Sequence, residues 1–210
     1  TTALVIIFQP ELRKALEELG SQNIISGLLS FDDGKENRAF TDRSVNEIVK
    51  ATFEMAKVKT GALMVIERST PLNEIERTGI EIDGLISSQL LINIFEHNTP
   101  LHDGAVVLSG NKVIAATCYL PLSDNMDISK DLGTRHRAAV GISEVSDSLT
   151  VVVSEETGRV SVAENGSLSH IKDSDELKKV LSRLTEQKET GGKRFKIWKG
   201  RIRNERKVAK

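Results

Sequence analysis

The chain has 210 residues, of which 39% are hydrophobic and 28% are charged, and its formal net charge is −1. This composition is typical of a soluble globular domain with a core of its own, and it excludes an intrinsically disordered chain. The longest apolar run, residues 3–8, is too short to cross a bilayer, and no signal peptide is recognisable, so we expect a soluble cytosolic protein. The lone cysteine, Cys118, excludes an intramolecular disulfide, and we expect it to be buried in the core.

Apolar spacing and turn residues predict strands and helices that alternate along the chain. The elements expected in the first half are a strand over 3–8, a helix over 10–19, a helix capped by Thr41 or Asp42, and a continuous apolar strand over 62–66. Those expected in the second half are a helix over 87–96, a hairpin of strands 104–108 and 112–119, a helix over 131–142, a hairpin of strands 149–154 and 159–163, and a closing helix over 173–188. Because hairpins interrupt the alternation, the sequence predicts an α/β fold with a mixed β-sheet and helices packed on it.

Residues 101–105, Leu-His-Asp-Gly-Ala, lie between a predicted helix and a predicted buried strand. Asp103 followed by Gly104 places a carboxylate at the mouth of a strand, where a ligand or another backbone segment can approach closely. By itself the pattern also fits, and rather favours, an ordinary turn in which Asp103 caps local amides.

Residues 132–139, Leu-Gly-Thr-Arg-His-Arg-Ala-Ala, combine a predicted helix start with three groups that can carry positive charge. A helix that opens at Gly133 and Thr134 presents unpaired amides and a partial positive charge to a phosphate. Arg135 and Arg137 add forked donors that match phosphate oxygens. On these residues alone, an Arg-His-Arg run on a solvated helix face is an equally good interpretation.

A third polar cluster, Ser154-Glu155-Glu156, follows a predicted strand. Its hydroxyl and carboxylates suit a phosphate or a metal ion, although a polar turn before Gly158 is the simpler explanation. The familiar glycine motifs for phosphate and dinucleotide binding are absent, as are the zinc-protease and serine-hydrolase signatures. The residue pattern alone therefore predicts an anionic-ligand site in a mixed α/β domain.

The Asp-Gly-Ala triplet at 103–105 and the Arg-His-Arg triplet at 135–137 resemble the paired motifs of the diadenylate cyclase domain. Their flanking residues, together with Phe-Gln-Pro-Glu-Leu-Arg at 8–13, resemble the membrane-tethered cyclases of Gram-positive bacteria. The similarity covers residues 1–165. It implies an enzyme that joins two ATP molecules into cyclic di-3′,5′-AMP, and a slightly curved mixed sheet wrapped by α-helices.

The resemblance also implies roles for individual residues. Asp103 orients or deprotonates the ribose 3′-hydroxyl with the help of Mg²⁺ or Mn²⁺, His102 helps to hold that metal, and Gly104 lets the ribose come close. The catalytic set is Asp103, Arg135, His136 and Arg137, with a structural role for His136 left open. The other residues implied in ATP binding are Ala105, Tyr119 and Leu120 beside the nucleoside, Gly133, Thr134 and Ser154 at the phosphates, and Glu155 and Glu156 at the metal or the ribose.

In this family one domain holds one ATP, so the resemblance implies a homodimer with facing sites. Transmembrane helices precede the family's cyclase domain, so we expect the native protein to be anchored at the cytoplasmic face of the membrane by a segment upstream of Thr1. Regulatory protein partners are expected as well, although no residue marks their docking surface. We assign the catalytic domain to residues 1–187 and a basic tail to 188–210.

The tail carries ten basic and two acidic residues, so its charge is +8 and that of the remaining chain is −9. A basic tail with Phe195 and Trp198 suits nucleic acid or an anionic membrane, but a solvated, frayed end is the simpler interpretation and nucleic-acid binding is not expected. Two further alternatives are a non-catalytic nucleotide sensor and a regulatory subunit that is active only with a partner.

Overall fold

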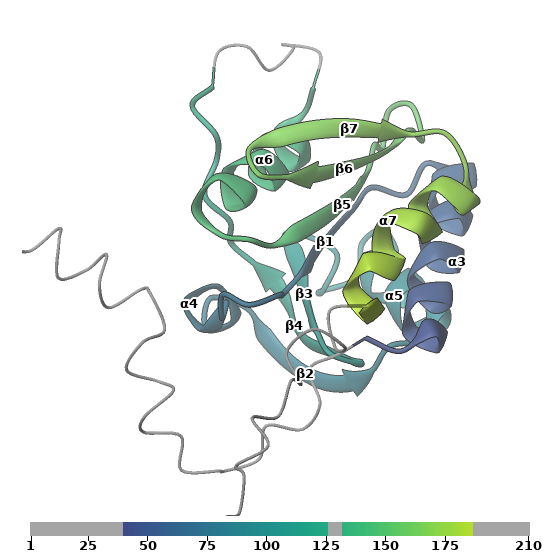
Figure 1. Ribbon diagram of the computed structural model, residues 1–210, viewed down its shortest axis with the longest axis horizontal. Coiled ribbons are helices and arrows are strands. Elements are labelled where there is room, and N and C mark those ends of the chain that lie inside the picture. The colour runs from purple at the N-terminus through teal and green to yellow at the C-terminus, as the bar shows by residue number, and fades with distance from the viewer. Residues whose placement is uncertain (1–39, 126–131, 187–210) are drawn as a thin grey trace, which may run out of the picture. The chain divides into compact units, whose positions relative to one another are not determined.

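A computed structural model of the protein describes residues 40–125 and 132–186, all within one compact unit of the chain (Figure 1). Its helices are α3 (Asp42–Val58), α4 (Asn73–Glu76), α5 (Ser88–Phe95), α6 (Thr134–Val145) and α7 (Ser174–Glu186). Its strands are β1 (Ala62–Ile66), β2 (Ile80–Leu85), β3 (Ala105–Ser109), β4 (Lys112–Cys118), β5 (Leu149–Val153), β6 (Val160–Glu164) and β7 (Ser167–Ile171).

The seven described strands form one open sheet in the order β2-β4-β3-β1-β5-β6-β7. The central strands β1 and β3 are parallel, with Met64 beside Val106, and each of the other neighbouring pairs is antiparallel. The pairing of β3 with β4 contains register shifts, which bend strands. The predicted α/β fold with a mixed sheet is confirmed.

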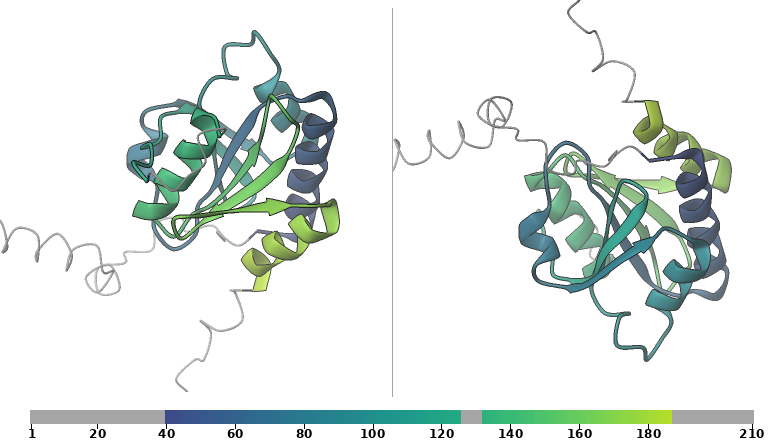
Figure 2. Two further views of the ribbon diagram at one scale, coloured as in Figure 1. Left: turned by 90° about the horizontal axis from the view of Figure 1, so that it is seen from above. Right: turned by 90° about the horizontal axis from the view of Figure 1, so that it is seen from below.

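Helices cover both faces of this sheet because its central strands are apolar on both sides (Figure 2). Side chains alternate along β1, so Met64 and Ile66 face one hydrophobic cluster and Leu63 and Val65 face the other. Helix α3 lies on the first face and packs against α5 and α7. Helix α6 lies on the second face, across β1, β5, β6 and β7. The start of α6 is thereby held next to the ends of two central strands.

The elements predicted within the described residues are all present, and three further ones were missed. The structure adds the single-turn helix α4 and the two edge strands β2 and β7. Both edge strands are largely exposed or half-buried, so they lack the apolar run that marks a central strand. Helix α6 begins at Thr134, whereas residues 3–8 and 10–19 lie outside the described part of the chain.

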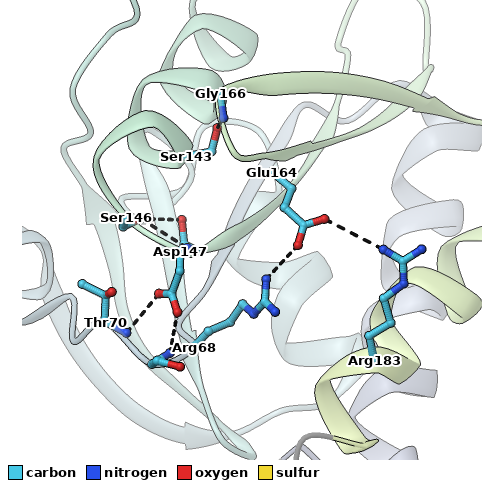
Figure 3. A network of polar contacts seen from close by, with 10 residues as sticks. Arg68, Thr70, Ser143, Ser146, Asp147, Glu164, Gly166 and Arg183 are labelled. Atoms are coloured by element: carbon cyan, nitrogen blue, oxygen red, sulfur yellow. Dashed lines mark hydrogen bonds and ion pairs between the residues drawn. The ribbon is translucent and has the colours of Figure 1, made fainter. Parts of the chain in front are cut away.

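A polar network joins residues at one end of strands β1, β5 and β6 (Figure 3). The carboxylate of Asp147 accepts hydrogen bonds from the backbone N–H groups of Ser69 and Thr70, each at 3.0 Å. Burial raises the pKa of Asp147, but these hydrogen bonds outweigh burial and the net pKa is lowered. Arg68 bonds Glu164 at 2.7 Å. The network joins the segment after β1 to β6 and leaves the opposite ends of β1 and β5 open.

Candidate active site

Two cavities adjoin at the start of α6. The first has a volume of about 320 Å³ and lies between the start of α6, the end of β5 and the turn that follows β5. The residues from the sequence analysis that line it are Gly133, Thr134, Arg135, His136, Ser154, Glu155 and Glu156. The turn after β5 and the helix start therefore form one polar chamber.

The second cavity, of about 230 Å³, has a mostly apolar lining. Asp103 and Gly104 line it at one side, together with Tyr119, Leu120, Leu63 and Leu122. Thr134 and Arg135 line both cavities. A ligand with a polar, anionic end and a flat, apolar end can therefore lie across the two cavities and contact these shared residues at its middle.

The start of α6 has the features of an anion site. Gly133 occupies the N-cap position with φ −69° and ψ 178°, and no side chain caps the helix. The N–H groups of His136 and Arg137 bond the carbonyl oxygen of Gly133. The first N–H groups of the helix, at Thr134 and Arg135, have no intrahelical acceptor, as at any helix start. They and the helix dipole favour a phosphate in the first cavity.

Arg135 is held in place by Glu155, which follows β5. Its Nη1 lies 2.5 Å from Oε2 of Glu155, and its Nε is buried and has no hydrogen-bond partner among the described residues. Gly61 lies beneath the pair, because a Cβ there would stand 3.0 Å from Oε2 of Glu155 and 3.1 Å from Cζ of Arg135. The guanidinium is thus oriented but not saturated, and an incoming phosphate can still accept hydrogen bonds from it.

Asp103 stands exposed at the edge of the second cavity, directly before Gly104. Gly104 has φ +102°, and a Cβ there would lie 2.9 Å from the carbonyl carbon of Thr117 and 3.0 Å from the carbonyl oxygen of Cys118. The glycine is therefore required by the close approach of the β4 backbone and by its own left-handed conformation. That turn fixes the position of the neighbouring Asp103.

We expect Gly104→Ala to destabilise the fold by about 1–3 kcal/mol, because an alanine there meets both a strained φ and a backbone clash. Thermal unfolding would show the change as a lower midpoint. Gly133→Ala is the matched control, since Gly133 has φ −69° and no atom within 4 Å of an added Cβ. Equal midpoints for wild type and Gly104→Ala would contradict this account of the turn.

An apolar wall closes the other side of the second cavity. Tyr119 and Leu122 are unusually exposed for large apolar residues, at 75% and 57%. The N–H of Tyr119 donates to Oγ1 of Thr78 at 2.9 Å, which fixes the backbone of the wall. Leu120 is half-buried beside them. A planar aromatic ligand that packs on these side chains would remove their apolar surface from water.

His136 and Arg137 differ in their surroundings, although they are neighbours. His136 is 5% exposed and lines the first cavity. Burial, reinforced by His170, lowers the pKa of His136, so its imidazole is neutral at neutral pH. Arg137 lines neither cavity, and its carbonyl oxygen accepts a hydrogen bond from the N–H of Ser123. Ala105 also lies outside both linings and is buried in β3.

His102 lies beside Asp103 and has one ring nitrogen engaged. Its Nδ1 is 2.6 Å from the carbonyl oxygen of Thr99, and because a carbonyl only accepts, Nδ1 carries the proton of the neutral ring. Nε2 then keeps a lone pair, which is the arrangement found in metal-binding histidines. No group of three His, Cys, Asp or Glu side chains suited to a metal occurs in 40–125 or 132–186. A metal here would need oxygen atoms of a bound phosphate to complete its shell.

The chain is similar to known proteins over most of its length. The family model DAC, described as "DisA bacterial checkpoint controller nucleotide-binding", matches residues 49–168. The chain is 49% identical over 201 residues to the cyclic di-AMP synthase CdaA of Bacillus subtilis, covering 95% of this chain and 71% of that protein. It belongs to the diadenylate cyclase (DAC) domain family. A diadenylate cyclase of Listeria monocytogenes is also 49% identical, over 94% of this chain and 71% of its own length.

Solved structures of DAC domains share the fold. A crystal structure of a double mutant of DacA from Staphylococcus aureus has a TM-score of 0.67 and 49% identity, and covers 69% of this chain and 97% of that one. A second structure, described as a hypothetical membrane spanning protein from Bacillus cereus, has a TM-score of 0.61 and 36% identity, over 80% and 79% of the two chains. The mixed sheet with helices on both faces is thus the architecture of the family.

Several residues of this candidate site were not singled out from the sequence. Gly61 lies under Arg135, and Leu63 and Leu122 line the second cavity. Arg159, directly before β6, and His170, in β7, also line the first cavity. Gly61 directly precedes a predicted central strand, where a glycine often marks the close approach of another group. His170 was missed because β7 was not predicted, although Asn165-Gly166, a typical two-residue hairpin loop, separates β6 from β7.

Proposed function

We propose that this DAC-domain chain is a diadenylate cyclase that converts two ATP molecules into cyclic di-3′,5′-AMP and two pyrophosphates. The observation that carries the proposal is the pair of adjoining cavities that share Thr134 and Arg135. The polar chamber at the helix start suits a triphosphate, and the apolar cavity beside Asp103 suits a nucleoside. The names of the relatives from Bacillus subtilis and Listeria monocytogenes support the same activity.

In the proposed reaction the ribose 3′-oxygen of one ATP attacks the α-phosphorus of the other. A new P–O bond forms, the bond between the α-phosphorus and the β-bridging oxygen breaks, and pyrophosphate leaves. Asp103 accepts the hydrogen bond of the 3′-hydroxyl and takes its proton as attack proceeds. Its place at the edge of the second cavity, fixed by the Gly104 turn, suits this role.

The phosphates would be held by the start of α6. The free N–H groups of Thr134 and Arg135 and the guanidinium of Arg135 stabilise negative charge on the α-phosphate in the transition state. Ser154 lines the same cavity and supplies a hydroxyl donor. His136, in its neutral form, supplies a further polar group to this cavity without adding a charge. In this account Arg135 shares its donors between Glu155 and the phosphate.

Mg²⁺ or Mn²⁺ fits the donor set if ATP contributes its phosphate oxygens. Asp103 offers carboxylate oxygen, and His102 offers the lone pair on Nε2. Glu155 and Glu156 line the first cavity and are further candidates for metal or ribose contact. When bound, such an ion neutralises phosphate charge and polarises the attacked phosphorus.

The proposed cyclase acts as a homodimer. The two cavities that share Thr134 and Arg135 suit one ATP, whereas the product needs two nucleotides that attack each other. Two domains with facing sites meet this need, and a two-fold axis makes both reactions equivalent. Exposed Tyr119 and Leu122 lie beside the second cavity, where the facing domain would approach. Regulatory protein partners stay a prediction.

We also propose that the protein works at the cytoplasmic face of the membrane. The described part of the chain contains no helix that is long and apolar enough to span a bilayer. Support comes from the relative from Bacillus cereus that is described as membrane spanning.

The activity can be tested by incubating the protein with ATP and either Mg²⁺ or Mn²⁺ and separating the products by chromatography. We expect cyclic di-AMP with two pyrophosphates per product molecule, and a specific activity that rises with protein concentration as dimers form. ATP binding without any dinucleotide product, at concentrations that force dimers, would instead indicate a nucleotide sensor.

A further inference from the structure

Two residues of the first cavity have no part in the chemistry described so far. Arg159 directly precedes β6, and His170 lies in β7. The two strands pair in register, with Val160 beside Ile171 and Ser161 beside His170, which brings the two side chains to the same cavity. They also line a further cavity of about 240 Å³ together with Val160 and Ile171. Arg159 and His170 therefore lie where the first cavity meets this third one.

The order of the cavities gives the direction of a bound ATP. The nucleoside side, next to Asp103, shares Thr134 and Arg135 with the first cavity. The first cavity also shares Arg159 and His170 with the third cavity, which does not include Thr134 or Arg135. A triphosphate that begins at Thr134 and Arg135 and extends away from the nucleoside thus runs toward Arg159 and His170.

The two side chains have the chemistry that a terminal phosphate needs. The lining of the first cavity contains two arginines, Arg135 and Arg159, and two glutamates, Glu155 and Glu156, so their charges balance. Glu155 is already paired with Arg135. Arg159 makes no ion pair with a described residue, so its guanidinium is the donor left for an anion.

His170 is held by a hydrogen bond of 2.9 Å between its Nδ1 and the hydroxyl of Ser161, which is fully buried. When the hydroxyl donates to Nδ1, the neutral ring carries its proton on Nε2. The protonated ring carries a proton there as well. His170 can therefore donate a hydrogen bond from Nε2 in both charge states.

We propose that Arg159 and His170 form the subsite for the terminal phosphate of ATP, and that pyrophosphate leaves past them. This inference rests on the proposed cyclase function and adds the residues that distinguish a triphosphate from a diphosphate. Arg135 and Thr134 act on the phosphate at which the new bond forms, whereas Arg159 and His170 act on the group that departs.

The test is a comparison of two ligands that cannot release their terminal phosphates by the proposed reaction, α,β-methylene-ATP and α,β-methylene-ADP. Their affinities for the whole chain with Mg²⁺ are measured by calorimetry for wild type, Arg159→Gln and His170→Asn. Removing a charged hydrogen bond to phosphate should weaken binding of the ATP analogue by roughly 10- to 100-fold for Arg159→Gln. The ADP analogue should bind all three proteins about equally. Pyrophosphate should inhibit both variants less than wild type.

Arg183→Gln is the matched control, since Arg183 is an exposed arginine on α7 that lines none of the three cavities. Equal losses for both analogues, or no loss for either, would overturn the terminal-phosphate subsite. Those outcomes leave cyclase activity in wild type intact, so they are distinct from failure of the proposed function, in which wild type makes no cyclic di-AMP. If Arg159→Gln folds poorly, His170→Asn, on the exposed edge strand β7, provides the same test through the ratio of its affinities for the two analogues.

Discussion

Replacing Asp103 by asparagine is expected to lower the rate of cyclic di-AMP formation by about 10²- to 10⁴-fold, the range of a lost general base. Asparagine keeps the size of the side chain and one acceptor oxygen, but it cannot take the proton of the 3′-hydroxyl. Because Asp103 is exposed at the cavity edge, the change should leave the folded state intact. Product formation is followed by chromatography, and ATP affinity by calorimetry under the same conditions.

The expected pattern is a large fall in kcat with little change in ATP affinity. Asp124→Asn serves as the control, because Asp124 is an exposed carboxylate that lines neither the phosphate chamber nor the nucleoside cavity. A variant with near-normal turnover would remove Asp103 from the reaction. Lost affinity with normal turnover at saturation would make it a binding residue only.

Replacing Arg135 by alanine is expected to cost about 10²- to 10³-fold in kcat, as for the loss of one donor that stabilises charge in the transition state. Arg135 lines both cavities, its Nη1 is oriented by Glu155 and its Nε is buried without a partner among the described residues. It is therefore placed where the two cavities meet. Arg135→Lys should restore little, because an ammonium cannot reproduce the forked donors.

Thermal stability distinguishes a catalytic role of Arg135 from a structural role in its ion pair. The pair of Arg135 and Glu155 is partly exposed, and such pairs contribute about 0–1 kcal/mol to stability. Arg135→Ala should consequently unfold at nearly the same temperature as wild type while losing turnover. Arg77→Ala, at the exposed C-cap of α4, should change neither quantity. A loss of turnover that merely follows a loss of folded protein would contradict the catalytic role of Arg135.

The central part of the fold could be predicted because its elements carry strong local signals. Residues 62–66 form a continuous apolar run, and Thr41 caps α3 through a hydrogen bond from the N–H of Ser44. The edge strands β2 and β7 lack such a signal, because a strand with one partner and a solvated face needs neither an apolar run nor strict alternation. The place of β2 depends on pairing with β4, which is distant in the sequence. By contrast, β7 follows β6 through the hairpin loop Asn165-Gly166, so its turn residues could have predicted it.

The candidate site, too, could be predicted only in part from the sequence. Asp103 and Arg135 carry motifs in the sequence, and the structure brings both to one cavity although they lie far apart along the chain. The ion pair of Arg135 with Glu155 depends on how α6 crosses β5, so spacing alone could not indicate it. Gly61 matters because its missing side chain leaves room for the ion pair of Arg135 with Glu155. Arg159 and His170 come to the same cavity because of the register between β6 and β7.

The central claim, that two facing domains each supply one half of the reaction, is tested most directly with mixed dimers. Wild-type protein is mixed with an excess of Asp103→Asn, so that nearly all wild-type subunits pair with a variant, and the products from ATP are separated by chromatography. In such a dimer one 3′-hydroxyl is activated and the other is not. The account predicts that the linear dinucleotide pppApA and one pyrophosphate accumulate, with little cyclic di-AMP. Cyclic di-AMP in proportion to the wild-type fraction, without the linear species, would show that one subunit completes the reaction alone and would contradict the account.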